Sequence, residues 1–140
     1  MYIGYIDTLP KIPEYLLEDT EVIAGKPQNP ESKHGHAMWF KVKQVPQELH
    51  DWLQSIFPFE IHSQYQVMNH QLPKHKDPDR DIALNYLLTT GGNNVSTVAF
   101  HPLYSRERVQ TMIIEEKRWH FIKTKMFHRV YDVDPDKLRI

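Results

Sequence analysis

Two residue types that bind metal ions lie two positions apart in segment 72–78. They are His75 and Asp77. In an extended backbone, side chains alternate between two faces, so both residues can point the same way and contact one ion. A third ligand must come from elsewhere in the chain, and His128 is the best-placed candidate. We therefore predict that His75, Asp77 and His128 bind Fe(II) as a facial triad and form the catalytic centre.

A set of two imidazoles and one carboxylate favours a transition metal. Imidazole nitrogen prefers Fe, Co, Ni, Cu or Zn to Mg or Ca, and a carboxylate lowers the net charge of the site. Ligands on one face of an octahedron leave the opposite face open for a bidentate organic acid and dioxygen. The chain has no cysteine, which excludes a thiolate site. His101 and His120 are alternative third ligands, although His120 alternates with Trp119 and Phe121, which predicts an outward-facing ring.

The order of these residues resembles that of the Fe(II)- and 2-oxoglutarate-dependent oxygenases. The matching pattern is Leu72-Pro73-x-His75-x-Asp77, then a strand with Asn85-Tyr86, then His128 and Arg139. The family motif is His-x-Asp, followed by a second histidine and then by a basic residue. Here Arg139 follows His128 by 11 residues. The resemblance covers residues 65–139.

The resemblance implies a fold, two cofactors and further binding residues. The fold is a double-stranded β-helix (jelly roll), and the cofactors are Fe(II) and the co-substrate 2-oxoglutarate. Arg139 and Tyr65 would contact the distal carboxylate of 2-oxoglutarate, and Asn85 would face the barrel interior in preference to Tyr86. Arginine suits this role because its planar guanidinium binds a carboxylate through two charge-assisted hydrogen bonds. The implied reaction is hydroxylation of an unactivated C–H bond with dioxygen.

Several of these assignments have alternatives. Tyr65 can be a core residue, and Lys137 can replace Arg139 as a weaker partner for the carboxylate. A single His-x-Asp also occurs by chance in solvated turns. The second hypothesis for the whole protein is a cupin-like metal enzyme without redox chemistry, or a jelly roll that binds a small ligand. A third is a metal-free jelly roll with a role in assembly.

The patterns around the candidate residues predict a mainly β chain with one or two N-terminal helices. Apolar residues recur at helical spacing between Pro46 and Pro58. Strands are expected near residues 37–43, 59–68, 82–88, 95–100, 109–115, 119–123, 127–133 and 137–140. The glycine- and asparagine-rich segment 91–94 predicts a hairpin turn between two of them. Residues 1–30 are expected to form an irregular arm with a short helix at 14–19.

Length and composition predict one domain over 1–140, with an N-terminal arm, strand and helix in 1–58 and a jelly-roll core in 59–140. The net charge of -1 argues against a nucleic-acid partner. The N-terminus has neither a signal peptide nor an apolar span, so we expect a cytoplasmic protein without a membrane partner. The substrate, a protein side chain or a small metabolite, and the oligomeric state stay open. Loops at His34 and His36 and at 103–108 are candidate lids.

Overall fold

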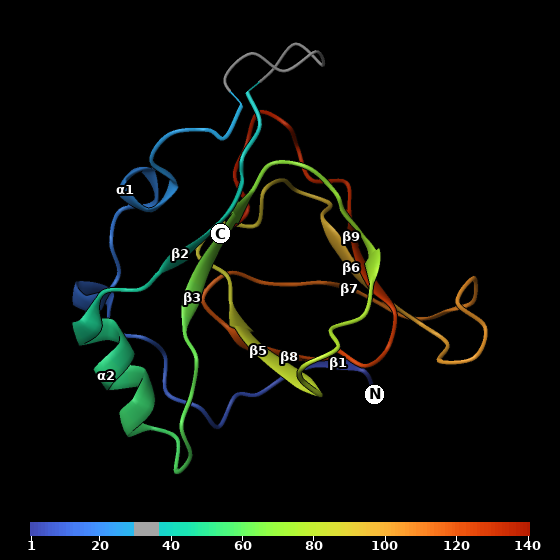
Figure 1. The fold of residues 1–140 in the computed structure, drawn as a ribbon, viewed down its shortest axis with the longest axis horizontal. Coiled ribbons are helices and arrows are strands. Elements are labelled where there is room, and N and C mark those ends of the chain that lie inside the picture. The colour runs from blue at the N-terminus through green and yellow to red at the C-terminus, as the bar shows by residue number, and fades with distance from the viewer. Residues whose placement is uncertain (30–36) are drawn as a thin grey trace.

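The computed structural model describes residues 1–29 and 37–140, which form nine antiparallel strands and two α-helices (Figure 1). One sheet has the order β4-β9-β6-β7, a second the order β1-β8-β5, and β2 pairs with β3. The strands are β1 (Ile3–Tyr5), β2 (Phe40–Gln44), β3 (Gln64–Met68), β4 (Leu72–His75), β5 (Ile82–Tyr86), β6 (Ser96–Phe100), β7 (Arg108–Ile113), β8 (Trp119–Lys123) and β9 (His128–Tyr131). The helices are α1 (Thr20–Ala24) and α2 (Gln47–Ser55), and Glu14–Leu16 is a single 3-10 turn.

The C-terminal residues connect the two smaller sheets. Arg139 forms antiparallel bridges to Met68 at the end of β3 and to Thr90 after β5. This places the C-terminal segment between β3 and the chain that follows β5, so that β3, the C-terminal segment, β5 and β8 form one curved wall. The β4-β9-β6-β7 sheet forms the other wall. The predicted mainly β fold is confirmed, and both helices lie in the N-terminal half as expected.

The predicted hairpin at 91–94 is wrong. Gly91 and Gly92 do adopt positive φ angles of 80° and 144°. However, β5 pairs with β8, whereas β6 pairs with β7 and β9, so this turn leads from one wall to the other. A glycine-rich turn specifies that the backbone reverses, but not whether the flanking strands pair. The N-terminus also differs from the expected irregular arm, because β1 pairs with β8.

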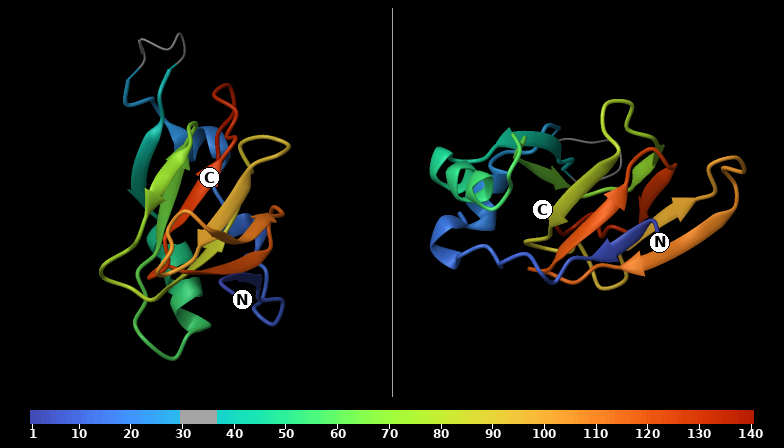
Figure 2. Two further views of the ribbon diagram at one scale, coloured as in Figure 1. Left: turned by 90° about the vertical axis from the view of Figure 1, so that its right-hand side faces the viewer. Right: turned by 90° about the horizontal axis from the view of Figure 1, so that it is seen from below.

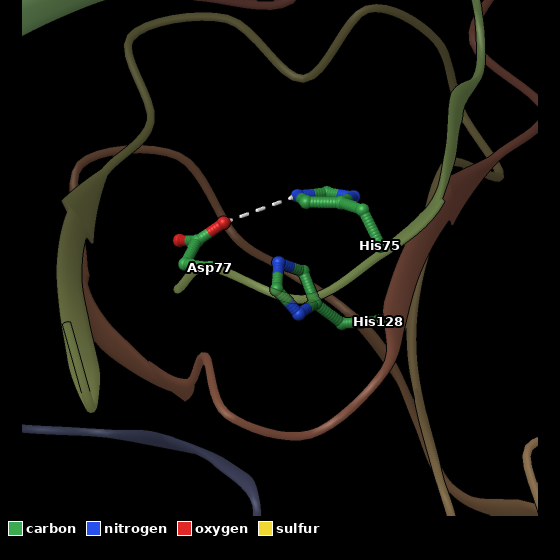
Figure 3. A group of neighbouring side chains, drawn as sticks. All are labelled: His75, Asp77 and His128. Carbon is green, nitrogen blue, oxygen red and sulfur yellow. Dashed lines mark ion pairs between the residues drawn. The ribbon is translucent and has the colours of Figure 1, made fainter. Parts of the chain in front are cut away.

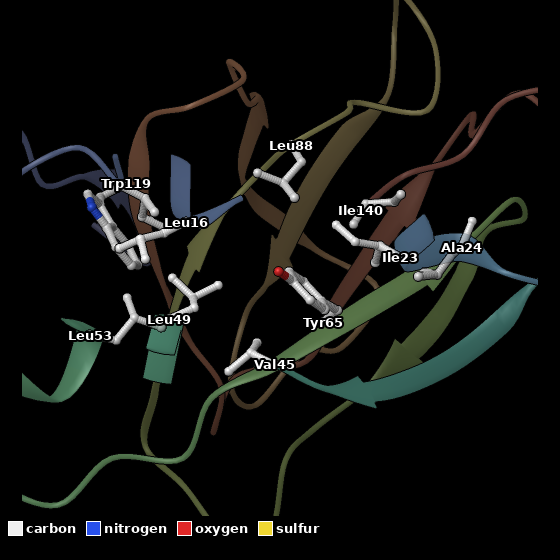
Figure 4. Close-up of a cluster of buried hydrophobic side chains, with 12 residues drawn as sticks. Leu16, Ile23, Ala24, Val45, Leu49, Leu53, Tyr65, Leu88, Trp119 and Ile140 are labelled. Carbon is white, nitrogen blue, oxygen red and sulfur yellow. The ribbon is translucent and has the colours of Figure 1, made fainter. Parts of the chain in front are cut away.

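The helical segments cover the outer face of the first wall, on the side away from the β6–β7 hairpin (Figure 2). The helix predicted between Pro46 and Pro58 is present as α2, with Pro46 as its N-cap. Leu49 and Leu53 of α2 are buried in a cluster that also contains Tyr65 and Trp119 of the sheet (Figure 4). Burying one such leucine stabilises the fold by about 2 kcal/mol. No helix in the described ranges is both long and apolar enough to cross a membrane.

Candidate metal centre

The side chains of His75, Asp77 and His128 converge inside the fold (Figure 3). One potential ligand atom from each residue lies within 4.8 Å of the other two. The Nε2 atom of His75 is 3.5 Å from Oδ1 of Asp77. Since metal–nitrogen and metal–oxygen bonds are about 2.0–2.2 Å long, small side-chain rotations suffice for all three to bind one ion. The structure thus brings together the three residues that the sequence selected.

Strand register explains why His75 and His128 meet. The two residues are direct partners on the antiparallel strands β4 and β9, and their ring centroids are 4.1 Å apart. His128 is also the partner of Ala99 on β6, and Ala99 packs between the two walls with Leu87. Cross-strand partners share a face of the sheet. Both imidazoles therefore face the interior between the two walls.

Backbone carbonyls orient both histidine rings. Nδ1 of His75 lies 2.7 Å from the carbonyl oxygen of Pro73, and Nδ1 of His128 lies 2.9 Å from that of Met126. A carbonyl can only accept, so each Nδ1 carries the proton and donates it. The protonated Nδ1 leaves the Nε2 lone pair of each ring free to bind a metal. Burial also lowers the pKa of His128, which keeps this ring neutral and able to coordinate at physiological pH.

The loop that carries Asp77 is held by the turn after β8. The backbone N–H of Asp77 donates to the carbonyl of Thr124 at 2.9 Å, and the backbone N–H of Thr124 donates to the carbonyl of Asp81 at 2.9 Å. The hydroxyl of the buried Thr124 donates to the carbonyl of Arg80 at 2.7 Å. Because β9 begins shortly after this turn, Thr124 fixes Asp77 relative to His128. No motif in the sequence indicated this role.

Arg80 orients the carboxylate of Asp77. Its Nε donates to Oδ2 of Asp77 at 2.7 Å, while Oδ1 faces His75. This arrangement leaves one oxygen for a metal and favours monodentate binding. Arg80 is exposed, so its pairing energy in solvent is small, and its effect is mainly on orientation.

The triad lies in a cavity of about 590 Å³ that Arg139 also lines. Arg139 is 6% exposed, and its guanidinium donates to the carbonyl of Thr90 at 2.9 Å and to the hydroxyl of Thr97 at 3.3 Å. No carboxylate of the described residues forms an ion pair with it. Burial lowers the pKa of Arg139 to about 10, so the side chain stays charged at neutral pH. A buried cation without an anionic partner is costly, which makes this position suited to an anionic ligand.

The other candidate binding residues take different positions. Asn85 lines the cavity and is the cross-strand partner of His120. Tyr65 lies three positions from Met68, the partner of Arg139, so its side chain is on the opposite face of the wall, in the cluster under α2, where it lines the far part of the same cavity. This placement favours the core-packing interpretation of Tyr65. Burial raises the pKa of Tyr65, and the nearby Glu18 carboxylate raises it further. Contact of either residue with a co-substrate stays a prediction.

The alternative residues are not at the triad. The outward orientation predicted for His120 is wrong: its ring is buried, lines the cavity and has its pKa lowered to about 4 by burial and by the charge of Arg139. His101 instead accepts hydrogen bonds from the backbone N–H groups of Leu103 and Tyr104. Lys137 is exposed and does not line this cavity.

Of the two candidate lids, His34 and His36 lie outside the described residues. The second, 103–108, lies in the connection from β6 to β7 and ends at the first residue of β7, and the ammonium of Lys74 donates to the carbonyl of Ser105. This contact attaches the loop to β4, the strand that carries His75.

No family model, curated protein or solved structure matches this chain significantly. The functional conclusion therefore depends on the geometry and chemistry of the site.

Proposed function

We propose that this protein is an Fe(II)- and 2-oxoglutarate-dependent oxygenase of the hydroxylase type. The observation that carries the proposal is the convergence of His75, Asp77 and His128 in one cavity with the buried, unpaired cation Arg139. A triad without the arginine is equally compatible with other metal chemistry. An arginine without the triad indicates only an anion site. The combination matches an iron centre that binds a dicarboxylate co-substrate.

The triad fits Fe(II) by its donor set and by its orientation. Two imidazoles and one carboxylate are the ligands of non-haem Fe(II) oxygenases. The Pro73 and Met126 carbonyls hold both rings in the tautomer that presents Nε2, and Arg80 occupies the second oxygen of Asp77. These contacts mean that the chain supplies three oriented ligand atoms and leaves the remaining side of an ion accessible from the cavity.

Arg139 would bind the distal carboxylate of 2-oxoglutarate. Its hydrogen bonds to Thr90 and Thr97 fix the guanidinium and leave other N–H groups available to a ligand. His120 is neutral beside it and adds no competing charge. The chain would thus hold the co-substrate at its charged end, while the walls of the cavity exclude water from the keto end.

Iron held by the triad and 2-oxoglutarate on Arg139 would supply the oxidising equivalent for C–H hydroxylation. In the balanced reaction, substrate R–H, 2-oxoglutarate and dioxygen give R–OH, succinate and carbon dioxide. One oxygen atom enters the product and the other enters succinate, so no external reductant is required.

Anaerobic titration with Fe(II) and 2-oxoglutarate tests this proposal. We expect a weak visible charge-transfer band that requires both components. Asp77→Ala should abolish the band because it removes a ligand, whereas Asp79→Ala, a change at an exposed aspartate two positions away, should retain it.

The same titration distinguishes the oxygenase from the second hypothesis, a metal enzyme without redox chemistry. Metal binding to the triad without the band would favour a non-redox metal enzyme. If neither metal binding nor the band is observed for the folded wild-type protein, the proposal is wrong.

A further inference from the structure

The cavity that contains the triad extends well beyond it. Besides His75, Asp77 and His128, its walls include Leu49 and Leu53 of α2. Its lining includes neighbours from both faces of β5, such as Asn85 and Tyr86, so the cavity extends past β5, where β3 and β5 are not hydrogen-bonded to each other and the C-terminal segment bridges the wall only at Met68 and Thr90. Its volume of about 590 Å³ lies within the range of roughly 300–1,000 Å³ found for pockets that hold drug-sized ligands. There is therefore room for a second molecule beside a small dicarboxylate.

The part of the cavity far from the triad is aromatic and almost uncharged. Five aromatic side chains line it, from the segment after α2 and from β3, β5 and β8: Phe57, Phe59, Tyr65, Tyr86 and Trp119. Among the described lining residues from Ile12 to Met68, Glu60 is the only Asp, Glu, Lys or Arg residue. The charged groups Asp77, Arg80 and Arg139 are contributed by the C-terminal half. A ligand bound in the aromatic part would therefore make its polar contacts at the end of the cavity that contains the triad.

Large apolar side chains remain exposed where this part of the cavity reaches the surface. Phe59, Ile82 and Leu84 all line the cavity and are 61%, 53% and 37% exposed. Leu84 and Tyr86 lie on the same face of β5, the face toward α2, where the rings of Tyr86 and Trp119 pair with centroids 5.0 Å apart. Exposed apolar residues that border a cavity mark binding sites more often than scattered ones do.

We propose that the substrate of this protein is an uncharged small molecule with an apolar body, which lies between α2 and β5. The statement that one bond of this molecule is oxidised at the triad rests on the proposed function. The statement that the molecule binds between α2 and β5 does not. The apolar wall stabilises the body of the substrate, and the absence of cations along that wall selects against an anionic one.

Binding of the dye N-phenyl-1-naphthylamine tests the proposal without metal or co-substrate. The dye is uncharged and apolar, and its fluorescence increases in apolar surroundings. We expect saturable binding to the wild type and about fivefold weaker binding to Ile82→Gln. The matched control is Ile113→Gln on β7, because Ile113 is 57% exposed but does not line the cavity. The control should bind the dye as the wild type does. Both positions are exposed, so both variants should fold.

Quenching by a metal tests whether the dye lies near the triad. Co(II), used in place of Fe(II), should quench the fluorescence of the bound dye in the wild type but not in Asp77→Ala. Quenching that is absent in the wild type, with Co(II) bound, would show that the aromatic part is not a substrate site for the triad and would overturn the inference.

Other outcomes also decide the question. Equal weakening by Ile82→Gln and Ile113→Gln means unspecific binding and overturns the proposal. Displacement of the dye by an extended peptide of alternating valine and serine, but not by a small cyclic hydrocarbon, overturns it in favour of a protein substrate. Dye binding with the expected variant pattern, but without the charge-transfer band, removes the oxygenase proposal and leaves the binding site. The band without dye binding removes this inference alone.

Discussion

Replacing Arg139 with methionine separates a binding role from a structural role. Methionine keeps most of the volume of the side chain but removes the charge. Burial lowers the pKa of Arg139 to about 10, which corresponds to a desolvation cost of about 3 kcal/mol for the charged form. The hydrogen bonds to Thr90 and Thr97 offset this cost by roughly 1.5 kcal/mol each. The two effects nearly cancel.

We therefore expect Arg139→Met to change the free energy of unfolding by less than about 2 kcal/mol, or the melting temperature by less than about 8 °C. The affinity for 2-oxoglutarate should fall about 30-fold or more, because truncating one partner of a buried charge pair costs about 2–5 kcal/mol. Thermal unfolding and calorimetric titration of the Fe(II)-loaded protein measure the two quantities. Arg108→Met, at an exposed arginine that does not line the cavity, is the control and should preserve the affinity.

The contrary result would refute the assignment of Arg139. A melting temperature that falls by more than about 15 °C, with an unchanged affinity for 2-oxoglutarate, would mean that the guanidinium is a structural element of the C-terminal segment. The co-substrate would then need another anchor.

Three further predictions concern the triad and its surroundings. Thr124→Val removes the hydroxyl donor to Arg80 without changing the side-chain shape. It should weaken Co(II) binding about tenfold in calorimetric titration, and unchanged affinity would contradict its positioning role. Acid should destabilise the fold through His120: its folded-state pKa of about 4 lies below the unfolded value of 6.5, so the unfolded chain binds more protons between these values. Urea unfolding should show a free energy about 1.5 kcal/mol lower at pH 5 than at pH 6.5, with a flatter dependence in His120→Phe; equal slopes would exclude His120 as the cause. Co(II) at about 100 times its dissociation constant should stabilise the fold by about 2.7 kcal/mol, and a gain of the same size in Asp77→Ala would place the metal elsewhere.

The local patterns predicted the elements that carry the site. Alternation around His75 and Asp77 indicated an extended backbone, and the structure has β4 up to His75, with Asp77 in the loop that follows. The apolar spacing between Pro46 and Pro58 predicted α2. Both signals depend on residues close together in the chain, so they can be read from the sequence without knowledge of the fold.

Contacts between distant segments could not be predicted in the same way. The direct pairing of His75 with His128 depends on the register of β4 and β9. The hydrogen bonds by which Thr124 holds the loop of Asp77 depend on how two loops pack together. His120 was expected to face outward because it alternates with Trp119. Both faces of β8 are buried: Trp119 packs into the cluster under α2, and His120 faces the interior between the walls. Alternation alone therefore cannot tell which way the His120 ring points.

Anomalous diffraction from crystals grown anaerobically with Fe(II) and 2-oxoglutarate tests the central claim most directly. We predict one iron peak, bonded to Nε2 of His75, one carboxylate oxygen of Asp77 and Nε2 of His128, with the distal carboxylate of 2-oxoglutarate on Arg139. A peak at other residues, or none at the triad in crystals that contain excess iron, would contradict the proposed function.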